Sequence, residues 1–131
     1  MLDTLKKPQF YLLLGIYTWL GVAPADTTIL GSYNDKLMHY IGYIILMNSC
    51  LFAYGTRPRK AVMFGMLLLY SFMIEVIQYF LPYREFSLLD LLANGLGLIT
   101  GQVLGLSAAR LSEIYHGQSP AELDDPDAPE S

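Results

Sequence analysis

Apolar residues gather in four long runs along the chain, and short polar segments or prolines separate these runs. The runs cover residues 10–23, 37–54, 61–81 and 88–106. A helix needs about 20 mostly apolar residues to cross a bilayer, and somewhat shorter runs still span when their flanking side chains reach the interface. The pattern therefore predicts an all-α membrane protein with four spans, a four-helix transmembrane bundle.

The first run is the shortest, and it admits two interpretations. Lys6 and Lys7 precede a short apolar core that ends in the Ala-Pro-Ala triplet at 23–25, a pattern typical of a secretory signal with its cleavage site. Tyr17 and Trp19 instead resemble the interfacial aromatic anchors of a retained span. We expect a retained helix, and either choice leaves the later spans unchanged.

Hydrophobic residues make up 53% of the 131 positions and charged residues only 15%, which favours membrane insertion over a soluble domain. Basic residues indicate the orientation, because short cytoplasmic loops are enriched in Lys and Arg. Six of the eight lie on one side of the four-span arrangement: Lys6, Lys7, Arg57, Arg59, Lys60 and Arg110. Lys36 and Arg84 lie on the other side. Both termini are therefore expected in the cytoplasm.

The charge is unevenly distributed, since six of the twelve acidic residues and none of the basic ones follow Arg110. Three prolines and few apolar residues accompany them. A segment of this composition cannot bury enough apolar surface to fold. We therefore expect a transmembrane domain over residues 1–110 and a disordered acidic cytoplasmic tail over residues 111–131.

Each of the last three runs also carries one stripe of polar or small residues at helical spacing. The stripes are Asp35, His39 and Tyr43; Ser71, Glu75 and Gln78; and Asp90, Asn94, Gly97 and Gly101. Residues three and four apart share one face of a helix, and a polar face turned toward lipid costs free energy. We therefore expect the three stripes to face one another in one layer near the outer membrane surface.

Glu75 is the most informative of these residues, because an acidic side chain at membrane depth costs of order 2.5 to 3.5 kcal/mol and is a functional candidate by default. We assign it the role of acid/base catalyst, with His39 relaying a proton and Asp35 orienting the imidazole. The remaining candidates would bind substrate. Arg84 and Lys36 suit a phosphate or carboxylate headgroup. The others are Gln78, Asp90, Asn94 and Tyr43.

The same residues admit a structural interpretation. Ser-x-x-Asp at 32–35 and again at 87–90 is the pattern of a helix capping box. Lys36 and Arg84 would then be interfacial anchors, and the amides of Gln78 and Asn94 would form hydrogen bonds between helices. Close helix packing is indicated by three glycines at four-residue spacing: Gly97, Gly101 and Gly105.

Other functional classes lack support in the sequence. No group of histidine, cysteine and carboxylate residues has the spacing of a metal site, so we expect no metal and no cofactor. No serine nucleophile is paired with a histidine in a recognisable motif. No basic patch supports nucleic-acid binding.

Three spaced motifs follow one another over residues 34–105. They are Asp35-Lys36-x-x-His39-x-x-x-Tyr43, Glu75-x-x-Gln78 and Pro82-x-Arg84-x-x-Ser87-x-x-Asp90-x-x-x-Asn94. Together they resemble the VanZ-like family of small bacterial membrane proteins, and the first run and the tail lie outside the resemblance. The resemblance implies a multi-pass protein of the bacterial inner membrane, in a family named after a protein that lowers susceptibility to the glycopeptide teicoplanin. It implies a location and a motif, and not a reaction.

These observations lead to one principal hypothesis and two others. The first is a protein of the cell envelope that binds or modifies an envelope lipid or a lipid-linked glycan at the outer leaflet, with membrane lipids as its partners. The second is a non-catalytic membrane assembly factor whose polar layer only locks the bundle. A proton or ion pathway ranks third, because the inner halves of the spans offer few polar residues.

Overall fold

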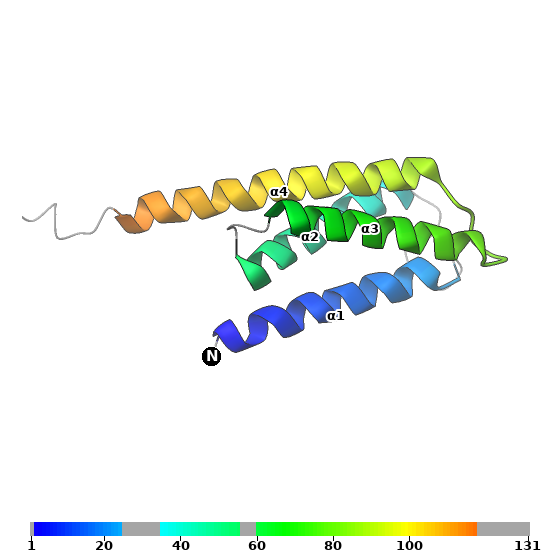
Figure 1. Cartoon of the computed structure of the whole chain (residues 1–131), viewed down its shortest axis with the longest axis horizontal. Helices are drawn as coiled ribbons and strands as arrows, with labels where there is room; N and C mark the ends of the chain where they lie inside the picture. Colours follow the sequence, from blue (N-terminus) through cyan, green and yellow to red (C-terminus); the bar gives the residue numbers. More distant parts are fainter. Residues whose placement is uncertain (1, 25–34, 56–59, 118–131) are drawn as a thin grey trace, which may run out of the picture.

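The computed structural model describes residues 2–24, 35–55 and 60–117. They form four helices: α1 (Leu2–Val22), α2 (Asp35–Tyr54), α3 (Lys60–Tyr79) and α4 (Leu88–Gly117). Successive helices run in opposite directions and lie side by side, and α4 projects past the others at its C-terminal end (Figure 1). The predicted all-α class is confirmed for this part of the chain.

Three of the helices are long and apolar enough to cross a membrane. They are Lys36–Tyr54, Lys60–Tyr79 and Leu88–His116, with mean hydropathies of 1.3, 1.8 and 1.4. The α1 helix has 21 residues, but Lys6 and Lys7 lie in its first half. The predicted apolar runs are thus confirmed for three helices, and a fourth crossing by α1 stays a prediction.

The α3 helix shows the distribution of polar and apolar side chains that a lipid environment favours. Met66 and Leu69 are 68% and 60% exposed, whereas Glu75 and Ser71 of the same helix are fully buried. Polar side chains therefore face the neighbouring helices and apolar ones face outward. This arrangement is the reverse of that in a soluble bundle.

The α4 helix extends well beyond the predicted run, which ended at residue 106. Residues 107–116 contain no proline or glycine to interrupt it, and the first glycine after them, Gly117, is its last residue. Residues 111–117, which the sequence pattern placed in a disordered tail, are therefore helical. The rest of that predicted tail, 118–131, lies outside the described residues.

Gly97 and Gly101 of the α4 glycine stripe pack against the backbone of α2. The sequence predicted close helix packing here, without naming the partner helix. A Cβ atom on Gly97 would collide with the carbonyl oxygen of Tyr40, and one on Gly101 would lie 2.8 Å from that of Ile44. Glycine at these positions lets the two helices approach more closely than larger residues would allow. The close approach brings the N-terminal turns of α2 and α4, which carry candidate site residues, next to each other.

Polar contacts attach α1 to both α2 and α3. The Gln9 side chain donates to the Ser49 carbonyl at 3.3 Å and accepts from its hydroxyl at 3.1 Å. The Thr18 hydroxyl lies 2.8 Å from that of Tyr70. These bonds make α1 part of the helical bundle and fix its height beside α2 and α3.

Candidate functional site

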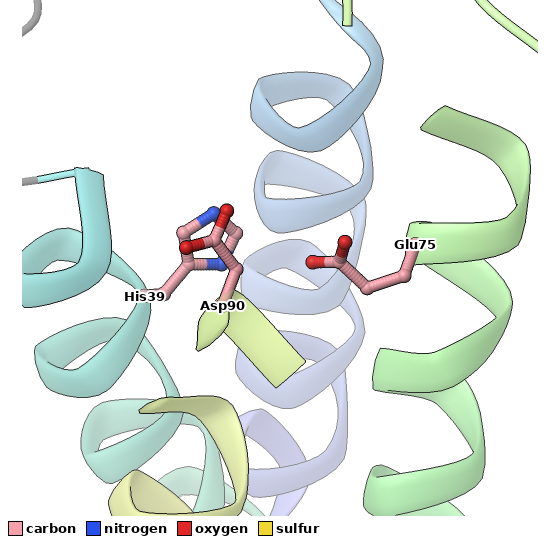
Figure 2. A group of neighbouring side chains, drawn as sticks. All are labelled: His39, Glu75 and Asp90. Atoms are coloured by element: carbon pink, nitrogen blue, oxygen red, sulfur yellow. The ribbon is translucent and has the colours of Figure 1, made fainter. Parts of the chain in front are cut away.

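Three ionisable side chains from three helices meet at one end of the bundle. His39 lies near the start of α2, Glu75 near the end of α3 and Asp90 near the start of α4. Each offers one potential ligand atom, and these three atoms all lie within 4.8 Å of one another. Figure 2 shows the Glu75 side chain extending from α3 toward His39 and Asp90. We refer to these three residues as the polar centre.

The three side chains of the polar centre are largely buried among the helices. Glu75 is fully buried, Asp90 is 7% exposed and His39 is half-buried. A buried charge requires a partner, a proton or a metal ion. Because the three groups come from three helices and lie within 4.8 Å of one another, the geometry agrees with the prediction that the polar stripes face one another.

An amide orients the imidazole of His39. His39 Nδ1 lies 3.0 Å from Asn94 Oδ1, and Asn94 Nδ2 donates to the Ser71 hydroxyl at 2.8 Å. Because Asn94 Oδ1 has no hydrogen to donate, Nδ1 of His39 carries the proton of the neutral ring. The ring's lone pair then lies on Nε2. Asn94 thus acts on His39 rather than lining a substrate position.

The start of α4 forms only half of the expected capping box. The Ser87 hydroxyl accepts the Asp90 backbone N–H at 3.2 Å, as the Ser-x-x-Asp pattern predicts. In a complete box the acid would accept the N–H of Ser87 in return. Here Oε2 of Glu75, on another helix, accepts that N–H at 3.1 Å. The carboxylate of Asp90 is therefore not used for capping and belongs to the polar centre.

Lys36 lies at the edge of the polar centre. Its Nζ is 3.6 Å from Oδ1 of Asp90, and its side chain is 58% exposed. Oδ1 of Asp90 is buried and accepts no hydrogen bond from any of the residues that the structure describes. The ammonium group therefore approaches Asp90 from the solvent side without forming a short bond to it.

Three further side chains at this end bind the last carbonyls of α1 and that of Ala23, the residue after it. Gln78 donates to Gly21 at 2.8 Å and Tyr83 to Val22 at 3.1 Å. Arg84 donates through Nε to Ala23 at 3.1 Å and through Nη2 to Leu20 at 3.0 Å. The final carbonyls of a helix have no partner within the helix, and a cation there complements the helix dipole. Gln78 and Arg84, predicted as substrate ligands, thus hold α1 in place.

A pocket of about 310 Å³ opens beside the polar centre. Its lining residues are Lys36, Gln78, Tyr83, Arg84, Glu85, Ser87 and Asp90. Asp90 belongs to both the pocket and the polar centre, so a ligand in the pocket would lie next to the buried groups. The pocket carries charges of both signs.

Tyr43 and Asp35 are the other two predicted site residues. Tyr43 is 4% exposed and packs in the hydrophobic core, where its ring lies 6.4 Å from that of Tyr17. It is not among the residues that line the pocket. Asp35 is the first residue of α2, and its side chain lies outside the described part of the structure.

Sequence reasoning missed the potential of the polar centre to hold a metal ion. The expectation of no metal rested on ligand spacing along the chain, whereas the three groups come from separate helices, with 35 residues between His39 and Glu75 and 14 between Glu75 and Asp90. Ser87 was predicted only as the cap of its own helix, and its bond to Glu75 crosses between helices. No local pattern could have indicated either feature.

Comparisons with known proteins agree with the motifs. A family model described as VanZ/LLP1 matches residues 9–109. An uncharacterised protein of the fission yeast Schizosaccharomyces pombe is 32% identical over 124 residues, which cover 88% of this chain and 75% of the yeast protein. No solved structure matches significantly. The matched region includes α1 from Gln9 onward, which the motif-based resemblance left out. The yeast relative does not support the expectation of a bacterial source.

Proposed function

The chain belongs to the VanZ/LLP1 family, and we propose that it is an integral membrane protein that binds the anionic headgroup of a membrane lipid or lipid-linked glycan in the pocket beside the polar centre. The observation that carries the proposal is the position of Lys36 and Arg84. Both cationic residues line a pocket that shares Asp90 with the buried centre. Cationic groups of this kind are the usual partners of phosphate and carboxylate.

The proposed membrane arrangement has four spans, with both termini and the loop between α2 and α3 in the cytoplasm. The apolar outer faces of α2, α3 and α4 support the crossings, and the excess of basic residues on one side supports the orientation. In this arrangement the pocket lies at the outer leaflet. A lipid could then place its headgroup in the pocket while its acyl chains stay in the bilayer.

The pocket also suits a headgroup that carries hydroxyl groups. Arg84 has five N–H donors, of which two bind the carbonyls of Leu20 and Ala23, so other donors of the same guanidinium are available to an anion. The carboxylates of Glu85 and Asp90 and the amide of Gln78 can bond to sugar or glycerol hydroxyls. This mixture of charges favours a phosphate joined to a polyhydroxy group over a simple inorganic anion.

The polar centre could act on such a ligand by moving a proton. His39 carries its lone pair on Nε2 because Asn94 holds Nδ1, so Nε2 can serve as a base. Glu75 lies close enough to exchange a proton with His39, directly or through one water molecule. When no metal ion occupies the polar centre, Glu75 and His39 can thus act as an acid/base pair.

A second candidate function is that of a non-catalytic membrane assembly factor. The observation that favours it is that Gln78, Tyr83 and Arg84 all bind α1 carbonyls, while Glu75 binds Ser87 at the start of α4. Much of the polar layer thus joins helices to one another. This function requires no ligand in the pocket.

Lipid retention separates the two candidates. The protein would be purified in mild detergent, washed extensively, and analysed by native mass spectrometry with lipid extraction. Lys36→Gln removes the exposed pocket cation, and Lys60→Gln is its matched control, because Lys60 is an exposed lysine that begins α3 at the opposite end of the bundle. We expect the unsubstituted protein and Lys60→Gln to retain a phosphorus-containing lipid that Lys36→Gln loses. Equal retention by both variants, or no retained lipid at all, would contradict the proposal.

A further inference from the structure

We propose that His39, Glu75 and Asp90 bind a divalent transition-metal ion such as Zn²⁺ or Mn²⁺. This inference stands on the polar centre and does not require a lipid in the neighbouring pocket. One imidazole nitrogen and two carboxylate oxygens form a mixed ligand set that suits such ions. Three protein ligands leave at least one position open for water or a substrate, which is the usual composition of a catalytic metal centre.

The separation of the ligand atoms is compatible with a metal ion at their centre. The three atoms lie within 4.8 Å of one another. A triangle with sides of that length has its centre about 2.8 Å from each corner, and Zn–N and Zn–O bonds are about 2.0 to 2.2 Å long. Each side chain therefore has to move by less than about 1 Å, which small side-chain rotations supply.

The hydrogen bonds around His39 are those of a metal ligand. A ligating histidine usually donates its second ring N–H to a neighbouring acceptor, which fixes both the tautomer and the plane of the ring. Asn94 supplies that acceptor to Nδ1 at 3.0 Å, and Ser71 holds the amide of Asn94 at 2.8 Å. Nε2 is then the nitrogen for the metal. In Figure 2 the Glu75 side chain extends from α3 toward the His39 ring and the Asp90 carboxylate.

Asp90 is the second, independent indication of a ligand. The Asp90 side chain is 10% exposed. Glu75 displaces its carboxylate from the capping role, and Oδ1 has no hydrogen bond from the described residues. The Lys36 ammonium group stays 3.6 Å from that oxygen. Desolvating a carboxylate without a hydrogen bond is costly, and coordination to a metal would offset that cost.

The charges also favour a divalent ion. Glu75 and Asp90 bring two carboxylates close together in a buried position, where two negative charges repel each other. An ion of charge +2 between them balances both. Glu75 can keep its bond to Ser87 through Oε2 while its other oxygen coordinates the metal. The pocket lined by Asp90 provides a route by which the metal enters.

Metal binding to the full-length, tag-free protein in detergent tests this inference. The protein is stripped with a chelator and titrated with Co²⁺, whose visible absorption intensifies when it is held by four or five protein and water ligands. Zn²⁺ content is measured in parallel by elemental analysis. We expect close to one ion per chain, competition between Co²⁺ and Zn²⁺, and a loss of affinity of about 10- to 100-fold in Asn94→Ala, because a removed outer partner has that effect.

The two histidines of the chain provide a matched pair of variants. His39→Gln should abolish the Co²⁺ absorption, while His116→Gln, at the exposed end of α4, should leave it unchanged. If His39→Gln fails to fold, the spectrum of the unsubstituted protein still decides the question. The weak absorption of hydrated Co²⁺ in the unsubstituted protein, a bound spectrum that persists in a folded His39→Gln variant, or one that His116→Gln removes would overturn the inference. Lipid retention without metal uptake would overturn this inference and leave the proposed function standing. Metal uptake without lipid retention would overturn the proposed function and leave this inference standing.

Discussion

Glu75, in the next-to-last turn of α3, accepts the backbone N–H of Ser87 at a distance of 3.1 Å from nitrogen to oxygen. This bond joins two helices that are adjacent in sequence. It also provides the acceptor for the Ser87 N–H that Asp90 would supply in a complete capping box. Glu75 thus has a structural contact and a place in the polar centre at the same time. The two roles can be separated, because the hydrogen bond needs an acceptor and a metal or proton site needs a carboxylate.

Substituting Glu75 should separate those roles. Glu75→Gln keeps an oxygen that can accept the Ser87 N–H, so we expect its unfolding free energy to stay within about 1 kcal/mol of the original. Glu75→Leu leaves that N–H without its acceptor and should cost about 1 to 3 kcal/mol. Unfolding in detergent, followed by circular dichroism, measures both. If Glu75→Gln were as unstable as Glu75→Leu, the charge itself would be part of what holds the fold together.

The packing of α4 on α2 should depend on which glycine is replaced. Gly97→Ala places a Cβ against the Tyr40 carbonyl, whereas Gly95→Ala meets only a Leu68 methyl group at 3.9 Å. We expect Gly97→Ala to destabilise the protein by about 1 to 3 kcal/mol. Gly95→Ala should be neutral or stabilising by up to about 1 kcal/mol, because alanine favours helix more than glycine does. Equal effects in the same unfolding measurement would show that the close approach of α2 and α4 is unimportant.

Arg84 should stabilise the last turn of α1 against local opening. Arg84→Lys keeps the charge but cannot reproduce two bonds from a planar guanidinium. Loss of about 1 kcal/mol of net hydrogen bonding corresponds to roughly five-fold faster amide exchange. The amide to follow is that of Ala23, which donates to Trp19, and hydrogen–deuterium exchange mass spectrometry reports it. Arg110→Lys, at an exposed position on α4, is the control. Similar exchange in both variants would show that the Arg84 hydrogen bonds do not stabilise the end of α1.

Thiol labelling should determine the number of crossings. In a Cys50→Ala background, single cysteines at Lys6, Glu85 and Glu113 report the two ends of the bundle. The four-span arrangement predicts that an impermeant reagent applied to intact cells reaches Glu85→Cys but not Lys6→Cys or Glu113→Cys. Labelling of Lys6→Cys together with Glu85→Cys would show that α1 does not cross the membrane. Labelling of Glu113→Cys instead of Glu85→Cys would reverse the orientation.

Much of the helical arrangement could be predicted from the sequence, because it follows from local pattern. The apolar runs at 37–54 and 61–81 lie within two residues of the ends of α2 and α3. The glycine stripe at 97, 101 and 105 predicted a close helix contact, and the structure places it against α2. The end of α4 could not be predicted this way, since an apolar run ends where lipid ends and a helix ends at a helix breaker.

The site was predictable only in part. Helical spacing indicated that His39, Glu75 and Asp90 turn inward, because a membrane makes any other direction costly. It could not indicate which partner each group meets. The capping pattern around Ser87 predicted Asp90 as the return acceptor, yet tertiary packing places Glu75 there. The role of Arg84 on α1 likewise depends on how a helix 61 residues earlier docks, for which no local signal exists.

Anomalous X-ray diffraction from crystals of the full-length protein grown with zinc tests the polar centre most directly. Data collected on both sides of the zinc absorption edge locate the metal without any assumption about the surrounding residues. We predict one strong anomalous peak between Nε2 of His39 and the carboxylate oxygens of Glu75 and Asp90, at about 2.0 to 2.2 Å from each. Absence of a peak there, while zinc is bound at His116 or elsewhere on the surface, would contradict the metal centre proposed for this membrane protein.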